Sequence, residues 1–341
     1  MRFIELHILQ SFPGVLLNRG EFNEPKTILF GGATRARVSS QAWKRAARLY
    51  AQELKPELFG GIRSKRFLKK LRQAFVDAGA PEKSADEMAA SVAKVIGNGL
   101  SDDEKAKTVL FFSEPGLDHI AKVVWKAKPG KDAKKLTAAI SDAAGSAPIS
   151  ADIGLFGRMV ASARPMDVHA AAFHSHWIGV APHASDIDFF TAVDDLLPEE
   201  ESGSGHMGHS TIGADTFYRC AVLSLDQIDL NLRHFDSNQK RQVAAAWMEA
   251  SLLAVPAACQ AGKFGATHPD YVVGMAGSGR PGSYGDAFTK TVSAGGKGIV
   301  DNAISALKNR IEETQRVFPR KVRVADIPRL TMAEFVDELL A

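Results

Sequence analysis

Cysteine is almost absent from this chain. The sequence has two, Cys220 and Cys259, both inside apolar segments, so we expect buried free thiols rather than a disulfide or a metal site. Also missing is any run of about 18 uncharged apolar residues, the length that a membrane-spanning helix needs. The opening "MRFIELHILQSF" carries Glu5 and His7 inside its apolar run, which is typical of a strand and not of a signal peptide. We therefore expect a cytoplasmic globular protein that does not engage a membrane.

Familiar catalytic signatures are missing as well. Ser39 and Ser40 do not lie in a GxSxG elbow, and "GSGRPGSYG" (277–285) lacks the GxxxxGK[ST] pattern of a phosphate loop, although Arg280 there is a candidate backbone contact. HxH and HxxH spacings, which suit zinc, occur among His169, His174, His176, His183, His206 and His209. No cysteine pair accompanies them, and the acids of 186–195 lack EF-hand spacing for Mg²⁺ or Ca²⁺. We expect no metal or cofactor, with zinc and Mg²⁺ as minor alternatives.

Acidic residues are scarce at the front of the chain. Residues 1–75 hold 15 lysines and arginines but 5 acids, whereas residues 76–341 hold 27 and 34, so the net charge of +3 hides a strong asymmetry. A concentrated positive end favours a polyanionic partner. A merely solvated basic surface would give the same composition, so charge alone does not decide.

The segment "RVSSQAWKRAAR" (37–48) contains no acid at all. Ser39 or Ser40 can cap a helix, and on that helix the i+3 and i+4 spacing places four polar side chains on one face, namely Gln41, Lys44, Arg45 and Arg48. Arg35, Arg37 and the flexible "FGG" (30–32) precede it, and the helix start adds serine hydroxyls and backbone N–H groups. Such donors hold phosphates without reading bases. The alternative is an amphipathic helix with a solvated basic face.

Patterning along the rest of the chain predicts an α+β fold. Residues 2–10 alternate like a half-buried strand, 11–37 read as loops with an apolar turn near 28–30, and 52–147 form helices with a small core of their own. Residues 185–215, with eight acids and no Lys or Arg, indicate a protruding loop or hairpin-like arm. Strands are expected at 217–225 and 270–277, and helices at 243–253 and 299–311.

A family resemblance appears when these pieces are combined. "HILQSFPGVLLNRGEFNEPKTILFGGATRARVSSQAWKRAAR", together with "IGLFGRMVAS", "SDIDFFTAVDDL" and "GADTFYRC", resembles the backbone subunit of the type I-E CRISPR Cascade complex. The resemblance is dense over 1–50 and 150–220 and diffuse elsewhere; the histidine-rich 202–213 matches no family motif.

The resemblance implies a hand-shaped protein whose copies coat a guide RNA. It implies an RNA-recognition-motif-like palm (1–51 and 217–341), helical fingers (52–149), a palm–fingers connection (150–184) and a thumb arm (185–216). Head-to-tail copies, other Cascade subunits and, through the guide, a target DNA strand would be its partners. The implied phosphate-binding residues are Arg19, Lys26, Ser39, Gln41, Lys44, Arg45 and Arg48. Met159 would lie as an apolar wedge against a kinked nucleotide, the alternative being plain core packing.

Two further expectations concern the arm and catalysis. RNA would repel the acidic arm, so we expect Asp194 and Asp195 to face the basic end of a neighbouring copy. The aromatic RNP pattern is absent, so RNA should be held by charge and not by stacking. We predict a non-enzymatic subunit; the alternative is an RNA-processing endoribonuclease that uses His7 or a loop histidine as its base.

Overall fold

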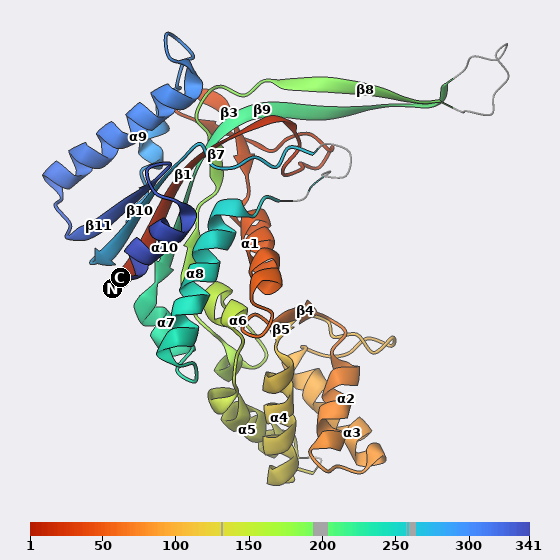
Figure 1. Ribbon diagram of the computed structural model, residues 1–341. Coiled ribbons are helices and arrows are strands. Elements are labelled where there is room, and N and C mark those ends of the chain that lie inside the picture. Colours follow the sequence, from red (N-terminus) through yellow and green to blue (C-terminus); the bar gives the residue numbers. More distant parts are fainter. Residues whose placement is uncertain (131, 194–203, 257, 259–263) are drawn as a thin grey trace. The chain divides into compact units, whose positions relative to one another are not determined.

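A computed structural model describes residues 1–130, 132–193, 204–256, 258 and 264–341 (Figure 1). The chain forms two compact units, each built from separate stretches of sequence. The sheet unit comprises Met1–Tyr50, His174–Val222 and Trp247–Ala341, and the helical unit comprises Ala51–Phe173 and Leu223–Ala246. The α+β class expected from the sequence is confirmed.

A large antiparallel sheet organises the sheet unit, with strands in the order β11-β10-β1-β9-β7-β3-β2 and with β8 paired to β9. The short β6 also pairs with β9. The strand bounds are β1 Arg2–Val15, β2 Thr27–Phe30, β3 Ala33–Val38, β6 Ala172–His174, β7 Trp177–Gly179, β8 Ser185–Val193, β9 Ser204–Ser224, β10 Tyr271–Ser278 and β11 Val322–Ile327. The apolar turn expected near residues 28–30 is instead strand β2, because it pairs with β3 from Thr27 opposite Ala36 to Phe30 opposite Ala33.

Helices cover both faces of this sheet. On β10, Val273 and Met275 pack in one buried cluster with Ala303 and Leu307 of α9. Gly274, between them, faces the other side, where a Cβ would meet side chains of α10. The helices and 3₁₀ turn that belong wholly or partly to the sheet unit are α1 Ser40–Leu54, α8 Ser237–Leu253, α9 Gly298–Val317, α10 Met332–Leu340 and the 3₁₀ turn η2 Gly285–Phe288.

Covering both faces changes the character of β1. The sequence pattern predicts a half-buried strand with Glu5 and His7 on the solvent side, and this prediction is wrong: both side chains are fully buried. Most of their polar atoms have partners inside, since the guanidinium of Arg320 donates to Glu5 Oε1 at 2.7 Å and His7 Nδ1 lies 2.9 Å from the hydroxyl of Tyr218, whereas His7 Nε2 makes no hydrogen bond to the described residues. Buried polar groups of this kind are tolerated only with such partners.

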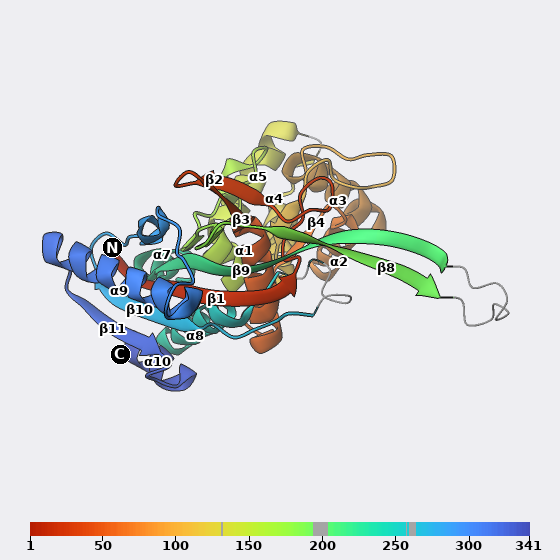
Figure 2. The ribbon, with the colours of Figure 1, turned by 90° about the horizontal axis from the view of Figure 1, so that it is seen from above.

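The predicted arm is a two-stranded hairpin. β8 pairs with the first part of β9 from Ser185 opposite Gly213 to Val193 opposite Ser204, and these paired strands run out beyond the rest of the sheet (Figures 1 and 2). Asp186 and Asp188 share one face of β8, while Ile187 and Phe189 lie on the other, because successive strand residues alternate. All four are exposed. Residues Asp194 and Asp195 lie outside the described residues.

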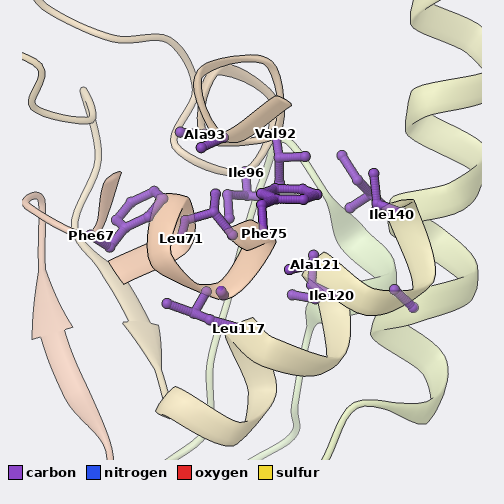
Figure 3. Packing of buried hydrophobic residues seen from close by; sticks show 14 of the residues in the cluster. Phe67, Leu71, Phe75, Val92, Ala93, Ile96, Leu117, Ile120, Ala121 and Ile140 are labelled. Carbon is purple, nitrogen blue, oxygen red and sulfur yellow. The ribbon is translucent and has the colours of Figure 1, made fainter. Parts of the chain in front are cut away.

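The helical unit has its own core, as the sequence predicts. Phe67, Leu71 and Phe75 pack against Val92 and against apolar residues of the next two helices (Figure 3). The elements are β4 Ile62–Ser64, α2 Leu68–Asp77, α3 Glu82–Ile96, β5 Leu110–Phe112, α4 Glu114–Ala127, α5 Ala133–Ser146, α6 Ala151–Phe156, η1 Arg164–Met166 and α7 Leu225–Asn231. Local signals start two of them: the hydroxyl of Ser113 caps α4 and the carboxylate of Asp132 caps α5.

The unit boundaries differ from the predicted division in two places. Residues 223–246 lie in the helical unit, although the sequence analysis groups them with the palm. The predicted palm–fingers connection, 150–184, is divided: residues up to Phe173 belong to the helical unit, and residues from His174 belong to the sheet unit. A functional division into palm, fingers and thumb stays a prediction. No helix among the described residues is both long and apolar enough to span a bilayer.

Candidate nucleic-acid interface

The basic helix α1 starts where the sequence predicts, and its start is held by internal hydrogen bonds. Ala42 donates its backbone N–H to Ser39 Oγ at 3.3 Å, as in an N-cap. The N–H of Ser39 donates to Asn18 Oδ1 at 2.9 Å, and the N–H of Ser40 donates to His176 Nδ1 at 3.1 Å. Protein acceptors therefore already occupy the N–H groups of Ser39, Ser40 and Ala42, and these three do not serve an incoming phosphate.

The predicted polar face of α1 is assembled. Gln41 and Arg45 are exposed, and Lys44 and Arg48 are half-buried. On the opposite side Trp43 and Ala47 are fully buried, so the helix packs on the sheet through one face and leaves the cations on the other. Burial lowers the pKa of Lys44, but the ammonium stays charged near neutrality because the ordinary value is so high.

A loop brings further cations to the same place. Lys26 donates its N–H to the carbonyl of Asn18 at 3.1 Å, and Arg37 donates its N–H to the carbonyl of Lys26 at 2.7 Å. The loop of residues 18–26 is thus tied by backbone hydrogen bonds to the strand that leads into α1. We call the resulting group the cationic cluster: Arg19, Lys26, Arg37, Lys44, Arg45 and Arg48.

The cationic cluster is poorly neutralised. Among the described residues, no carboxylate forms an ion pair with Arg37, Lys44 or Arg45. Arg19 is exposed and donates to the side-chain oxygen of Asn23, at 3.3 Å. Like charges held together without acids repel one another, so this arrangement is stabilised when an external polyanion binds.

Arg35 is a correction to the predicted phosphate-binding set. Its side chain is fully buried, and its guanidinium donates to the carbonyls of Gly179 at 2.9 Å and Phe288 at 3.1 Å. Arg37, two residues along the same strand, is half-buried. Arg35 therefore joins β3 to β7 and η2 instead of facing a ligand.

A second buried arginine, Arg219 of β9, supports α1 from beneath. Its guanidinium carbon lies 4.1 Å from the ring centroid of Trp177 and 5.0 Å from that of Trp43. It donates to Gln10 Oε1 at 2.5 Å and to the carbonyl of Leu252 at 2.8 Å. Burial lowers the pKa of Arg219 to about 9, so it is still a cation at neutral pH. Sequence analysis places Arg219 in a strand but gives no sign of this role.

His7, the base of the alternative endoribonuclease, is sealed in the core. Beyond Tyr218, its Nε2 lies 3.5 Å from Glu5 Oε1. Burial opposes a charge on the ring, but neighbouring Cys220 and Glu5 outweigh it and raise the pKa of His7 to about 9. At neutral pH His7 is therefore a protonated, inaccessible imidazolium, the wrong state and the wrong place for a general base.

The other predicted features are scattered. Within the described parts of the chain, no three His, Cys, Asp or Glu side chains gather as a metal site. His183 instead pairs with Asp215 at 3.0 Å. Met159 belongs to the helical unit and is 83% exposed, so the alternative of core packing is wrong. Cys220 is a buried free thiol as expected, and Cys259 lies outside the described residues.

Comparisons with known proteins agree with this fold. A chain of a solved structure described as "CRISPR RNA-guided surveillance complex, pre-nicking" is 28% identical, with a TM-score of 0.79 over 98% of this chain and 95% of that one. A chain of a "CRISPR RNA-guided surveillance complex" is 24% identical, with a TM-score of 0.63 over 98% and 92%, a likeness of fold. No curated protein sequence matches. A family model described as CT1975-like protein matches residues 4–334, and because that range is nearly the whole sequence, the chain belongs to the CT1975-like protein family.

Proposed function

We propose that this protein is a guide-RNA-binding backbone subunit of a CRISPR RNA-guided surveillance complex of type I-E. The observation that carries the proposal is the cationic cluster, because its cations lie on α1 and on a loop that backbone hydrogen bonds tie to the strand leading into α1, and because no carboxylate of the described residues pairs with Arg37, Lys44 or Arg45. Consecutive phosphates of a single strand need such a row of donors. The likeness to a chain of a surveillance complex supports the same conclusion.

Guide sequence would not be read by this protein. Arg and Lys side chains that contact phosphates hold the strand in register and leave its bases free to pair with a target DNA strand. Met159 would act as an apolar wedge against a kinked nucleotide, in keeping with its exposure. We propose that this complex works in the cytoplasm.

The arm fits assembly of several copies along one RNA. Its described part separates an acidic face, with Asp186 and Asp188, from an apolar face, with Ile187 and Phe189. We propose that the acidic face, extended by Asp194 and Asp195, meets the basic front end of the next copy, and that other subunits of the complex bind as further partners. Complementary charges would set the register of a head-to-tail filament more than its affinity. The sheet unit would act as an RNA-recognition-motif-like palm.

We further propose that the subunit is not an enzyme. The buried, protonated state of His7 supports this, because it removes one of the two bases considered for RNA cleavage. A loop histidine remains as the base of the alternative endoribonuclease. His176 is exposed but accepts a hydrogen bond from Ser40 at Nδ1, which fixes its tautomer and orientation in a capping role.

One experiment separates the two functions. Purified protein is mixed with guide-like RNAs of increasing length, with and without EDTA, and the products are measured by native mass spectrometry and by gel electrophoresis. We expect the number of bound copies to grow in steps with RNA length and the RNA to stay intact. Cleaved RNA would favour the endoribonuclease, and a copy number independent of RNA length would refute the filament.

A further inference from the structure

Phe22 is held out into solvent next to the cationic cluster. Its side chain is 87% exposed, and no other large hydrophobic side chain of the described residues is as exposed. A single exposed apolar residue is common on protein surfaces and means little alone. What distinguishes Phe22 is the hydrogen-bonded turn that carries it and the two cations, Arg19 and Lys26, on either side of that turn in the sequence.

The turn that carries Phe22 is built from several hydrogen bonds. The N–H of Phe22 donates to Glu24 Oε2 at 2.9 Å, and the N–H of Gly20 donates to the carbonyl of Glu24 at 2.7 Å. Arg19 reaches across to Asn23, which adopts a left-handed φ of 65°, and Arg19 also forms a backbone bridge with Pro25. Because these bonds hold the backbone that carries the ring, little backbone freedom is lost when a ligand packs on Phe22.

The base of the same turn is tied to the start of α1. Asn18 is the common acceptor: its carbonyl takes the N–H of Lys26 and its side chain takes the N–H of Ser39. Phe22 is three residues from Arg19 and four from Lys26, so at most roughly 10–15 Å separates its Cα atom from the Cα atom of either residue. The carboxylate of Glu24, which would repel phosphate, is engaged with the backbone of Phe22 itself.

We infer that Phe22 is a stacking platform for one nucleobase of the bound RNA, beside the phosphates held by Arg19 and Lys26. Exposed aromatic rings that alternate with cations are how sequence-tolerant proteins hold single strands, because every base has a π face. This inference rests on the proposed RNA-binding function. It also amends the expectation that the RNA is held by charge alone.

The test uses a single-stranded RNA that is long enough for one copy only, with 2-aminopurine at successive positions. The variants are F22A, F22L, which keeps an apolar side chain without a ring, and F22W, which keeps the ring. L29A is the matched control, since Leu29 is an exposed apolar residue, at 75%, on the neighbouring strand β2. Both positions are on the surface, so the thermal unfolding midpoint of each of the four variants should stay near that of the wild type.

We expect F22A and F22L to weaken binding by about tenfold and to restore fluorescence at one 2-aminopurine position that the wild type quenches. F22W and L29A should bind and quench like the wild type. Unchanged affinity and quenching in F22A would overturn the inference. So would a loss confined to assembly of several copies on long RNA, because Phe22 would then contact a neighbouring copy. Variants of Lys44 and Arg45 separate the stacking inference from the proposed RNA-binding function. If these variants bind RNA poorly while F22A binds normally, the stacking inference is wrong and the proposed function stands.

Discussion

Neutralising two cations of α1 should change the salt dependence of RNA binding by a predictable amount. The double variant K44Q/R45Q removes two charges from the polar face of α1 and keeps side chains of good helix propensity. For single strands, the logarithm of the binding constant falls with the logarithm of salt concentration by about 0.7 per phosphate neutralised. The six residues of the cationic cluster therefore give a slope of about −4, and the variant should give about −3.

The same relation predicts the loss of affinity. Removing two phosphate contacts changes the slope by about 1.4, so the variant should bind about 25-fold more weakly near 0.1 M salt, with the two lines converging near 1 M. Fluorescence anisotropy of a labelled single-stranded RNA, titrated at several KCl concentrations, measures both quantities. Circular dichroism melting checks that the variant is folded, which we expect because Arg45 is exposed and Lys44 is only half-buried.

A control variant separates local contact from net charge. K308Q/R316Q makes the same charge change on α9, another helix of the sheet unit, where both side chains are exposed. Its slope should equal that of the wild type. If K44Q/R45Q keeps the wild-type slope, or if both double variants change it equally, the cationic cluster does not grip phosphates and the reasoning behind the proposed function is refuted.

Three further predictions concern the fold that holds the site. Gly31 has φ of 59°, and a Cβ there would lie 1.6 Å from the carbonyl oxygen of Thr289, so G31A should lower the free energy of unfolding by about 2–4 kcal/mol. G32A should cost clearly less, because a Cβ at Gly32 meets nothing within 4 Å. Urea denaturation measures both free energies. His7 has its pKa raised from 6.5 to about 9, so its ionic contribution, about 3 kcal/mol at most, is complete below pH 6.5 and lost as pH rises through 9. H7Q should remove this decline in a stability-against-pH series, and a wild type whose stability is flat over that range would contradict it. F75A should cost about 3–5 kcal/mol in chemical denaturation, because Phe75 is fully buried in the core of the helical unit; a loss below about 1 kcal/mol would show that this core does not pack as described.

Features that depend on residues close together in the sequence could be predicted from the sequence alone. The cap at Ser39 and the i, i+3 and i+4 spacing of Gln41, Lys44, Arg45 and Arg48 act within a few residues, so the start of α1 and its polar face follow from the sequence alone. The helical repeat of the apolar residues likewise predicts the core of the helical unit around Phe75. The strand at 270–277 and the arm follow for the same reason, since alternation and composition are local properties.

Only the tertiary structure decided which polar residues are buried. Arg35 and Arg37 have the same residue type and the same strand face, yet η2, which follows some 250 residues later, covers Arg35 and leaves Arg37 half-exposed. Glu5 and His7 alternate with apolar residues in the pattern of a half-exposed strand, yet both are buried: Arg320, near the C-terminus, pairs with Glu5, and Tyr218 and Tyr284 lie against His7. Burial depends on which distant elements pack against a strand, and a pattern confined to neighbouring residues does not contain that information.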